Sequence, residues 1–272
     1  MTDTHMAASA SGPIESGAEP EDRSTPRPAV PAGQTGRGSR WRRTLRRPGT
    51  WIPLALLGIY LVLWTLVLAR PTFLTSFDLW VRDRVQDSAH ADLDGAHRWR
   101  LIKHTADLGG SVAVPGGSGH IQLGMVLLGV VALLAAAVRR SWRPVAAAAA
   151  GYAALGVVLV LKAVGNRPGP SMAGQVFSDG LGYFPSGHTG TTMLCYGTSA
   201  LILAFVFTGR PLRLLIAAGM TLLALAVGSA LVWMDYHWLS DVLGSYALGG
   251  AALFVVARIL GFRIGVSRST DR

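Results

Sequence analysis

Six long runs without charged side chains constrain this chain most. They cover residues 51–69, about 121–138, 144–161, 189–209, 214–234 and 242–257. A helix needs roughly 20 apolar residues to cross about 30 Å of hydrocarbon. The runs lack the two-residue alternation of a lipid-facing barrel strand, and the bilayer offers backbone groups no water, so each run must be a helix. The sequence therefore predicts an all-α polytopic membrane protein, a bundle of six transmembrane helices.

Composition and charge support the same class. Half of the 272 residues are hydrophobic and only 15% are charged, which is unusual for a soluble domain. The formal net charge of +10 is compatible with nucleic-acid binding, but many arginines lie in the first 50 residues and beside the apolar runs. That distribution favours a lipid bilayer as partner and no nucleic acid. Cys195 is the one cysteine, so an intrachain disulfide is excluded.

The chain divides into a tail, a membrane domain and a short end. Residues 1–47 are rich in Pro, Gly, Ser and Ala and show no apolar periodicity, so we expect a disordered tail. Its basic end suits a membrane surface, and its first 30 residues lack the pattern of a signal peptide. Residues 48–262 form the predicted membrane domain, and 263–272 form a short tail. Residues 71–118 mix acidic and basic side chains and predict interfacial or loop helices.

Basic residues in the short loops predict the orientation. They lie between the second and third runs, between the fourth and fifth, and after the sixth: Arg139, Arg140, Arg143, Arg210, Arg213, Arg258, Arg263, Arg268 and Arg272. Six crossings put them all on the side of the N-terminal arginines, which the positive-inside rule assigns to the cytoplasm. We therefore expect a multi-pass protein of the cell membrane with both termini cytoplasmic.

Three polar clusters then meet at the outer, extracytoplasmic face. Lys162 and Arg167 follow the third run, residues 185–189 (PSGHT) begin the fourth, and His237 with Asp241 precede the sixth. Because the topology alone brings these clusters to one face, we predict a shared site.

His237 and Asp241 are four positions apart, so on a helix they would share one face. The carboxylate can accept from one ring nitrogen, which leaves the other nitrogen as a nucleophile or base. Ionisable side chains at membrane depth are costly and usually functional. The alternative is that the pair only caps a helix at the interface.

Pro185, Ser186 and Gly187 suit a helix N-terminus, where free N–H groups and the helix dipole favour an anion. Gly187 lets a ligand approach the backbone closely, and Ser186 can donate a further hydrogen bond. His188 would then stand beside a bound oxyanion and protonate a leaving oxygen. The alternative is an N-cap with an incidental histidine.

Lys162 and Arg167 add two cations, and cations beside helix N–H groups make a phosphate clamp. For Lys162 alone, the simpler interpretation is a side chain that reaches from the span end toward the interface.

Together, residues 162–168, PSGHT at 185–189 and HWLSD at 237–241 resemble the motifs of the type 2 phosphatidic acid phosphatase (PAP2) family. Its site is related to those of vanadium haloperoxidases and glucose-6-phosphatase. The resemblance covers roughly residues 50–260 and implies a six-span bundle with a haloperoxidase-like core.

The resemblance also implies roles for the site residues. His237 would attack phosphorus to give a phosphohistidine, Asp241 would orient it, and His188 would protonate the leaving group and then activate water. The phosphoryl oxygens would be held by Lys162, Arg167, Ser186 and the Gly187 N–H. No metal ion or other cofactor is implied, since the clamp supplies the positive charge.

The chain departs from the family pattern in two motifs. The first motif usually has an arginine seven residues after the lysine, where this chain has Gly169, and Arg167 comes at five. The third usually has an arginine six residues before the histidine, where this chain has Leu231. Loss of one phosphate donor commonly costs on the order of 10²–10³ in rate. Candidate substitutes in the outer segment are Arg98, Arg100 and Lys103.

The leading hypothesis is hydrolysis of a phosphate ester or pyrophosphate on a lipid, with phosphatidic acid, phosphatidylglycerol phosphate and polyprenyl pyrophosphate all compatible. Phosphoryl transfer to another acceptor is a close variant. The second hypothesis is a catalytically weakened protein that binds lipid phosphate or a partner, which the missing arginine motivates. A transporter is less favoured, because the ionisable residues gather at one face. The number of subunits is not indicated.

Overall fold

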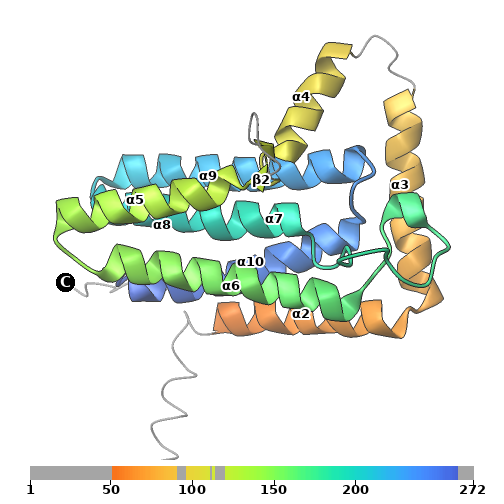
Figure 1. Cartoon of the computed structure of the whole chain (residues 1–272), viewed down its shortest axis with the longest axis horizontal. Helices are drawn as coiled ribbons and strands as arrows, with labels where there is room; N and C mark the ends of the chain where they lie inside the picture. Colours follow the sequence, from red (N-terminus) through yellow and green to blue (C-terminus); the bar gives the residue numbers. More distant parts are fainter. Residues whose placement is uncertain (1–50, 91–95, 111, 114–119, 263–272) are drawn as a thin grey trace, which may run out of the picture.

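A computed structural model describes residues 51–90, 96–110, 112–113 and 120–262 of the chain. The predicted tails, 1–47 and 263–272, lie outside the described residues. Six helical segments run side by side as a bundle in the described part (Figure 1). They are α2 (Trp51–Ala69), α5 (Leu123–Arg139), α6 (Arg143–Gly165), the joined pieces α7 to α8, α9 (Arg210–Trp233) and α10 (Leu239–Ile259). The predicted all-α membrane bundle is confirmed.

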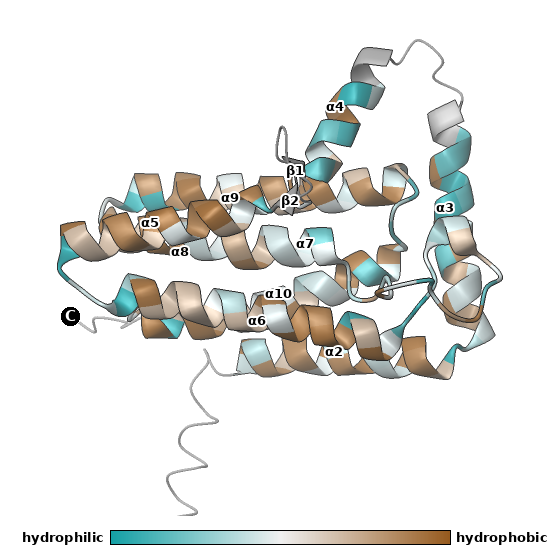
Figure 2. Cartoon of the chain, viewed as in Figure 1, coloured by the Kyte–Doolittle hydropathy of each residue, from teal (hydrophilic) through white to brown (hydrophobic). Residues whose placement is uncertain are grey.

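Five of these segments are long and apolar enough to cross a membrane, and α5, with 17 residues, is a shorter apolar helix. At 1.5 Å per residue α5 still extends about 26 Å. The outward faces carry exposed leucines such as Leu61, Leu133 and Leu222. Figure 2 shows hydrophobic residues along the bundle helices, with the hydrophilic ones gathered on α3, on α4 and near the helix ends. Exposed leucines in such number suit hydrocarbon rather than water.

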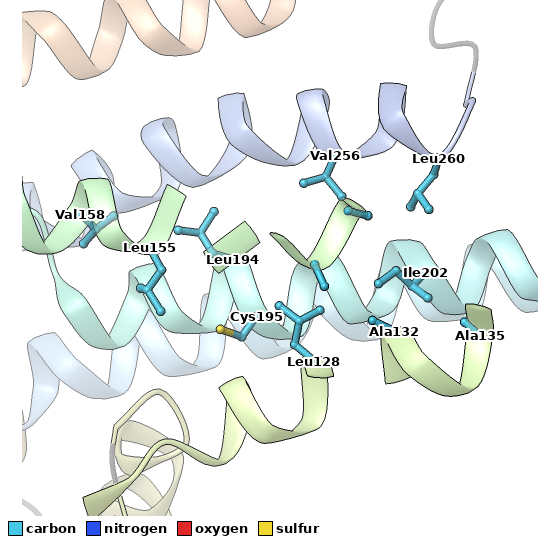
Figure 3. Packing of buried hydrophobic residues seen from close by; sticks show 12 residues of the cluster. Leu128, Ala132, Ala135, Leu155, Val158, Leu194, Cys195, Ile202, Val256 and Leu260 are labelled. Carbon is cyan, nitrogen blue, oxygen red and sulfur yellow. The ribbon is translucent and has the colours of Figure 1, made fainter. Parts of the chain in front are cut away.

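The fourth segment is the central one. It consists of α7 (Gly187–Thr191), the π-helical η2 (Thr192–Tyr196) and α8 (Gly197–Val206). Single π turns inside helices often lie near functional sites, and this one begins four residues after His188. Side chains from α5, α6 and α10 surround the segment in one buried apolar cluster (Figure 3), which includes Leu128, Leu155, Leu194, Cys195, Ile202 and Val256.

Two helices lie outside the bundle. Figure 1 shows α3 (Thr72–His90) across one end and α4 (Ala96–Asp107) projecting beside it. A two-residue antiparallel pairing of β1 (Val112–Ala113) with β2 (His120–Ile121) precedes α5. Helices are therefore present where the mixed 71–118 segment predicted them.

The short loops bring arginines to the other end of the bundle. The Arg139 guanidinium, at the end of α5, lies 5.6 Å from the ring centroid of Phe205 on α8. The Arg213 guanidinium on α9 lies 5.5 Å from the ring of Phe262, just after α10. The loops 166–186 and 234–238 lie at the opposite end, beside α3. The two ends thus differ in charge as expected, and the side of the membrane that each faces stays a prediction.

Helix α9 packs tightly against α10 at Gly228. Tyr246 of α10 donates its hydroxyl to the carbonyl oxygen of Ala224 at 2.6 Å. A Cβ at position 228 would overlap the Tyr246 hydroxyl and lie 2.7 Å from Cγ1 of Val242. The contact therefore needs a residue without a side chain.

We expect Gly228→Ala to lower the thermal unfolding midpoint in detergent micelles. Overpacking costs about 1–3 kcal/mol, which outweighs the roughly 0.5–1 kcal/mol that alanine gains over glycine in a helix. The matched control is Gly219→Ala on the same helix, where a Cβ would meet nothing within 4 Å. A Gly228→Ala midpoint at or above that of Gly219→Ala would contradict this packing.

Candidate active site

The PSGHT segment is fastened to α10 by backbone contacts. The Ser186 N–H donates to the carbonyl oxygen of Asp241 at 3.1 Å, and the Ser245 hydroxyl donates to the Ser186 carbonyl at 2.8 Å. Ser186 is fully buried, and its Oγ accepts from the Thr189 N–H at 3.3 Å as the N-cap of α7. The predicted helix start is thus present, and the serine hydroxyl serves it as a cap.

Phe184 holds the same segment against α2. Its ring is fully buried and lies 5.9 Å from the ring of Tyr60 and 6.0 Å from that of Trp64, centroid to centroid. A Cβ at Gly244 would lie 2.6 Å from the Phe184 ring, so α10 also presses against it. Helices α2 and α10 therefore fix the backbone that carries His188.

His237 lies before α10 and not on it, because the helix begins at Leu239 with Trp238 as its N-cap residue. The predicted sharing of one helix face is therefore wrong. Asp241, in the first turn of α10, reaches back instead: its Oδ2 accepts from the Trp238 N–H at 3.2 Å and lies 3.3 Å from Nδ1 of His237. The carboxylate both caps the helix and orients the ring. With Nδ1–H donating to it, Nε2 of His237 carries the lone pair.

The two predicted histidines face one space. Their ring centroids are 5.9 Å apart with the planes at 66°. The Tyr183 ring stands edge-on to His237 at 5.4 Å. The structure therefore brings together His188, His237 and Asp241 as the sequence predicted.

Burial sets the protonation of His237. The side chain is 4% exposed, and desolvation lowers its pKa below the usual 6.5. The Asp241 carboxylate raises this pKa, while Lys162 and Arg167 lower it, with burial as the largest effect. The imidazole is thus neutral at pH 7, as a nucleophile must be.

Lys162 turns toward the histidines. Its Nζ lies 5.9 Å from the ring centroid of Tyr183 and would lie 3.6 Å from a Cβ at Gly187. The side chain is partly buried. Lys162 and the first residue of α7 therefore border the same space as the two rings.

Arg167 is held by side chains of α3 and α10. Its Nη1 donates to Asp241 Oδ1 and to Ser240 Oγ, both at 2.6 Å, and its Nη2 donates to Asp78 Oδ2 at 2.7 Å. The side chain is 13% exposed, and its guanidinium also lies over the Trp238 ring at 5.6 Å. Two carboxylates thus occupy this cation, and these contacts do not place it as a free phosphate ligand.

Asp78 of α3 is the site residue that the motifs did not reveal. Its side chain is 1% exposed, and it accepts from the Ser240 N–H at 3.1 Å and the Ser240 hydroxyl at 2.6 Å. One signal in the sequence points to it: Leu74, Asp78 and Arg82 follow each other at four-residue spacing, so the aspartate shares a helix face with a buried leucine.

The position of the missing arginine is filled by apolar packing. Leu231 is fully buried in a cluster with Ala106 of α4, Val227 and Val242. The neighbouring Asp235 forms a two-armed ion pair with Arg82 of α3, at 2.8 Å in each arm.

The end of α4 covers His188. A Cβ at Gly110 would lie 2.9 Å from Nε2 of His188, and a Cβ at Gly109 would overlap its carbonyl oxygen. Of the candidate substitute cations, Lys103 on α4 pairs with Asp107 at 2.7 Å, and the side chain of Arg98 lies outside the described residues. The two glycines thus let the backbone after α4 lie directly on the histidine.

A cavity of about 410 Å³ leads from the polar residues along α5 and α6. Lys162, Gly187 and His188 line its polar part. Its apolar part is lined by Met125, Tyr152, Leu155, Gly156 and Leu159. Residues 152–162 cover about 15 Å of helix, so the cavity has the reach of an extended hydrocarbon chain. In the described part of the chain, no group of three or more His, Cys, Asp or Glu side chains is placed to hold a metal ion.

Comparison with known proteins agrees with the motifs. The family model described as PAP2 superfamily matches residues 144–264, which include all three motifs. This match confirms the predicted resemblance over that range. No curated protein matches the chain.

A solved structure shares the fold. It is the crystal structure of the first transmembrane PAP2 type phosphatidylglycerolphosphate phosphatase from Bacillus subtilis, with a TM-score of 0.60 and 19% identity. The similarity covers 76% of this chain and 94% of that one. At 19% identity this similarity shows the membrane fold alone. Asp78 lies outside residues 144–264, the range that the family model matches.

We expect the imidazole of His237 to titrate below pH 6.5, because burial disfavours its charged form. ¹⁵N NMR of histidine-labelled protein in micelles measures this, with His237→Gln assigning the resonance among the seven histidines. A midpoint at or above 6.5 would show that the ring is not held neutral by burial.

Proposed function

We propose that this membrane protein is a phosphatase that hydrolyses a lipid phosphate or polyprenyl pyrophosphate through a phosphohistidine at the outer membrane face. The observation that carries the proposal is the pair of imidazole rings 5.9 Å apart, one of them held by a buried carboxylate. A binding site for phosphate alone has no need of an oriented, neutral imidazole. The PAP2 match over all three motifs supports the same reaction class.

The first step uses both histidines. Nε2 of His237 attacks the phosphorus atom, and the bond between phosphorus and the lipid oxygen breaks. His188, in its protonated form, gives its proton to that leaving oxygen. The Asp241 carboxylate stabilises the positive charge that develops on the ring of His237.

The second step reverses the roles. His188, now neutral, takes a proton from a water molecule whose oxygen attacks the phosphorus atom. The bond between phosphorus and nitrogen breaks, and its electron pair returns to Nε2 of His237. Inorganic phosphate leaves, and His188 is again protonated. With an alcohol in place of water, the same step would be a phosphoryl transfer.

The phosphoryl oxygens are proposed to lie against Lys162 and the Gly187 N–H. The ammonium group faces Gly187, so the two donors converge on one position beside His188. A cation and a free backbone N–H stabilise negative charge on the phosphoryl oxygens without a metal ion. Ser186 contributes indirectly, as the cap of the helix that carries His188.

The lipid is proposed to enter with its chain along α5 and α6. The cavity joins the polar residues to an apolar surface, and its walls include the exposed residues Met125 and Leu159. A substrate with a phosphate at one end and a hydrocarbon chain at the other matches both parts. The arginines at the opposite end of the bundle support a cytoplasmic position for that end and an extracytoplasmic position for the site.

One observation favours a second candidate, a membrane protein that binds lipid phosphate without turnover. Leu231 replaces the third-motif arginine, and Arg167 is occupied by carboxylates. A site with few free cations stabilises the transition state less. Phosphate release distinguishes the two candidates.

We expect purified protein to release phosphate from lipid phosphates, and His237→Ala to reduce kcat by at least about 10³-fold because the nucleophile is lost. His188→Ala should cost about 10²–10⁴-fold with a lipid alcohol as leaving group, and much less in the first step with a nitrophenolate, which needs no proton. The matched control is His104→Ala, an exposed histidine of α4. Full activity in His237→Ala would reject the mechanism, and no release from any lipid phosphate would favour the binding candidate.

We expect Gly156→Leu to impair turnover of long-chain substrates only. A Cβ at Gly156 meets nothing within 4 Å, so the leucine folds normally but fills the cavity. Losing the burial of two or three methylenes, at about 0.8 kcal/mol each, should lower kcat/KM about tenfold or more. A water-soluble short-chain phosphate should be hydrolysed as before. Gly219→Leu, on an open face of α9, is the control. Equal effects on long and short chains would place the lipid elsewhere.

A further inference from the structure

Two buried carboxylates share one guanidinium behind His237. The exposed fraction of the Arg167 side chain is 13%, that of Asp78 is 1% and that of Asp241 is 0%. Each carboxylate takes one end of the guanidinium: Nη1 donates to Asp241 at 2.6 Å and Nη2 to Asp78 at 2.7 Å. The three groups come from α3, from the loop after α6 and from α10.

Asp78 also supports the first turn of α10. Its Oδ1 accepts from the Ser240 N–H at 3.1 Å and its Oδ2 from the Ser240 hydroxyl at 2.6 Å. The first N–H groups of a helix have no partner within the helix, so an aspartate from another helix satisfies one of them here. Ser240 directly precedes Asp241. The aspartate of α3 therefore fixes the backbone beside the residue that orients His237.

We propose that Asp78 is a positioning residue for the phosphatase reaction: it holds Arg167 and the start of α10 so that Oδ2 of Asp241 stays on Nδ1 of His237. The role rests on the proposed function, since it acts through the nucleophile. It also gives Arg167 a structural task, away from the phosphate.

A guanidinium prefers to form two parallel hydrogen bonds to the two oxygens of one carboxylate. Asp78 is needed because Arg167 would otherwise bind both oxygens of Asp241. With Asp78 in place, Arg167 contacts Oδ1 of Asp241 and leaves Oδ2 to His237 and to the Trp238 N–H. Without Asp78, the free Nη2 would turn to Oδ2 and compete with the imidazole. Asp78 thus keeps Arg167 from binding both carboxylate oxygens of Asp241.

Charges on several elements face His237. They are Asp241 of α10, Lys162 of α6, Arg167 of the following loop and His188 of α7, with the Tyr183 ring beside them. Asp78 adds a negative charge one step further away, across Arg167. Its removal leaves the positive charge of Arg167 less balanced, which disfavours a protonated His237.

The test is Asp78→Asn, which keeps the shape and removes the charge. We expect kcat to fall by about 10²-fold, as for other small misplacements of catalytic groups. KM and inhibition by inorganic phosphate should stay within about twofold, because the proposal has Asp78 and Arg167 act through Asp241 and not on the substrate. Asp83→Asn, an exposed aspartate of the same helix, is the control and should behave as the unmodified chain. Unchanged kcat, or a rise in KM and in the phosphate inhibition constant alone, would overturn the proposal.

A second readout needs no turnover. In ¹⁵N NMR, the titration midpoint of His237 should move to lower pH in Asp78→Asn and stay in place in Asp83→Asn. That shift without phosphate release from any lipid would reject the proposed function and leave the positioning contact standing. Phosphate release with neither a lower kcat nor a shifted midpoint in Asp78→Asn would reject the contact alone.

A second variant covers failure to fold. Asp78→Asn leaves Arg167 paired with Asp241, so no buried charge loses its only partner. The partners of Asp78 are all donors, however, and the NH2 group of an asparagine could face them. Asp78→Ala avoids that contact and should show the same loss of kcat with unchanged phosphate inhibition. An Asp78→Ala variant with normal kcat would overturn the positioning role.

Discussion

The site depends on two hydrogen bonds that join the Ser186 backbone to α10, a contact called the joint below. The Ser186 N–H and carbonyl bind the Asp241 carbonyl and the Ser245 hydroxyl, at 3.1 and 2.8 Å. His188 follows this joint by two residues and His237 precedes Asp241 by four, so the joint sets how far apart the two rings stand. Buried backbone hydrogen bonds of this kind are costly to leave unmade. The apolar packing of Phe184 against α2 covers the same segment. The proposed reaction needs this fixed separation, because one ring attacks phosphorus while the other transfers the proton.

Charge balance explains why so many ionisable groups are tolerated near the end of an apolar bundle. Arg167 is balanced by Asp78 and Asp241, Arg82 by Asp235, and Lys103 by Asp107. The first two sets tie α3 to the turns at the end of the bundle. A buried pair contributes little to stability, but a broken one is expensive. These pairs therefore act mainly as constraints on where α3 and the start of α10 can lie. Lys162 forms no ion pair in the described part of the chain, which leaves it available to an anion.

The sequence predicted the bundle well because continuous apolar runs have one solution in a bilayer. It also predicted that His188, His237 and Asp241 meet, since their motifs begin helices at one end. It did not reveal partners that are distant along the chain. Nothing local shows that Arg167 binds Asp78, 89 residues away. The spacing of His237 and Asp241 suggested a shared helix face. Because α10 starts at Leu239, two residues after the histidine, Asp241 contacts His237 from the first turn of the helix instead. The Lys162 ammonium lies near Tyr183 and Gly187, and the pattern of apolar residues in the sequence does not reveal these contacts.

The loss of the third-motif arginine and the position of α4 belong together. An arginine at 231 would point into the buried contact with Ala106, where its charge would be unpaired and its side chain would not fit. Leu231 lets α4 dock there, and docking brings Gly109 and Gly110 onto His188. The positive charge that the arginine would have supplied must then come from groups already beside the rings. In the proposed reaction Lys162 is one such group, and the backbone N–H of Gly187, which faces the Lys162 ammonium, is another.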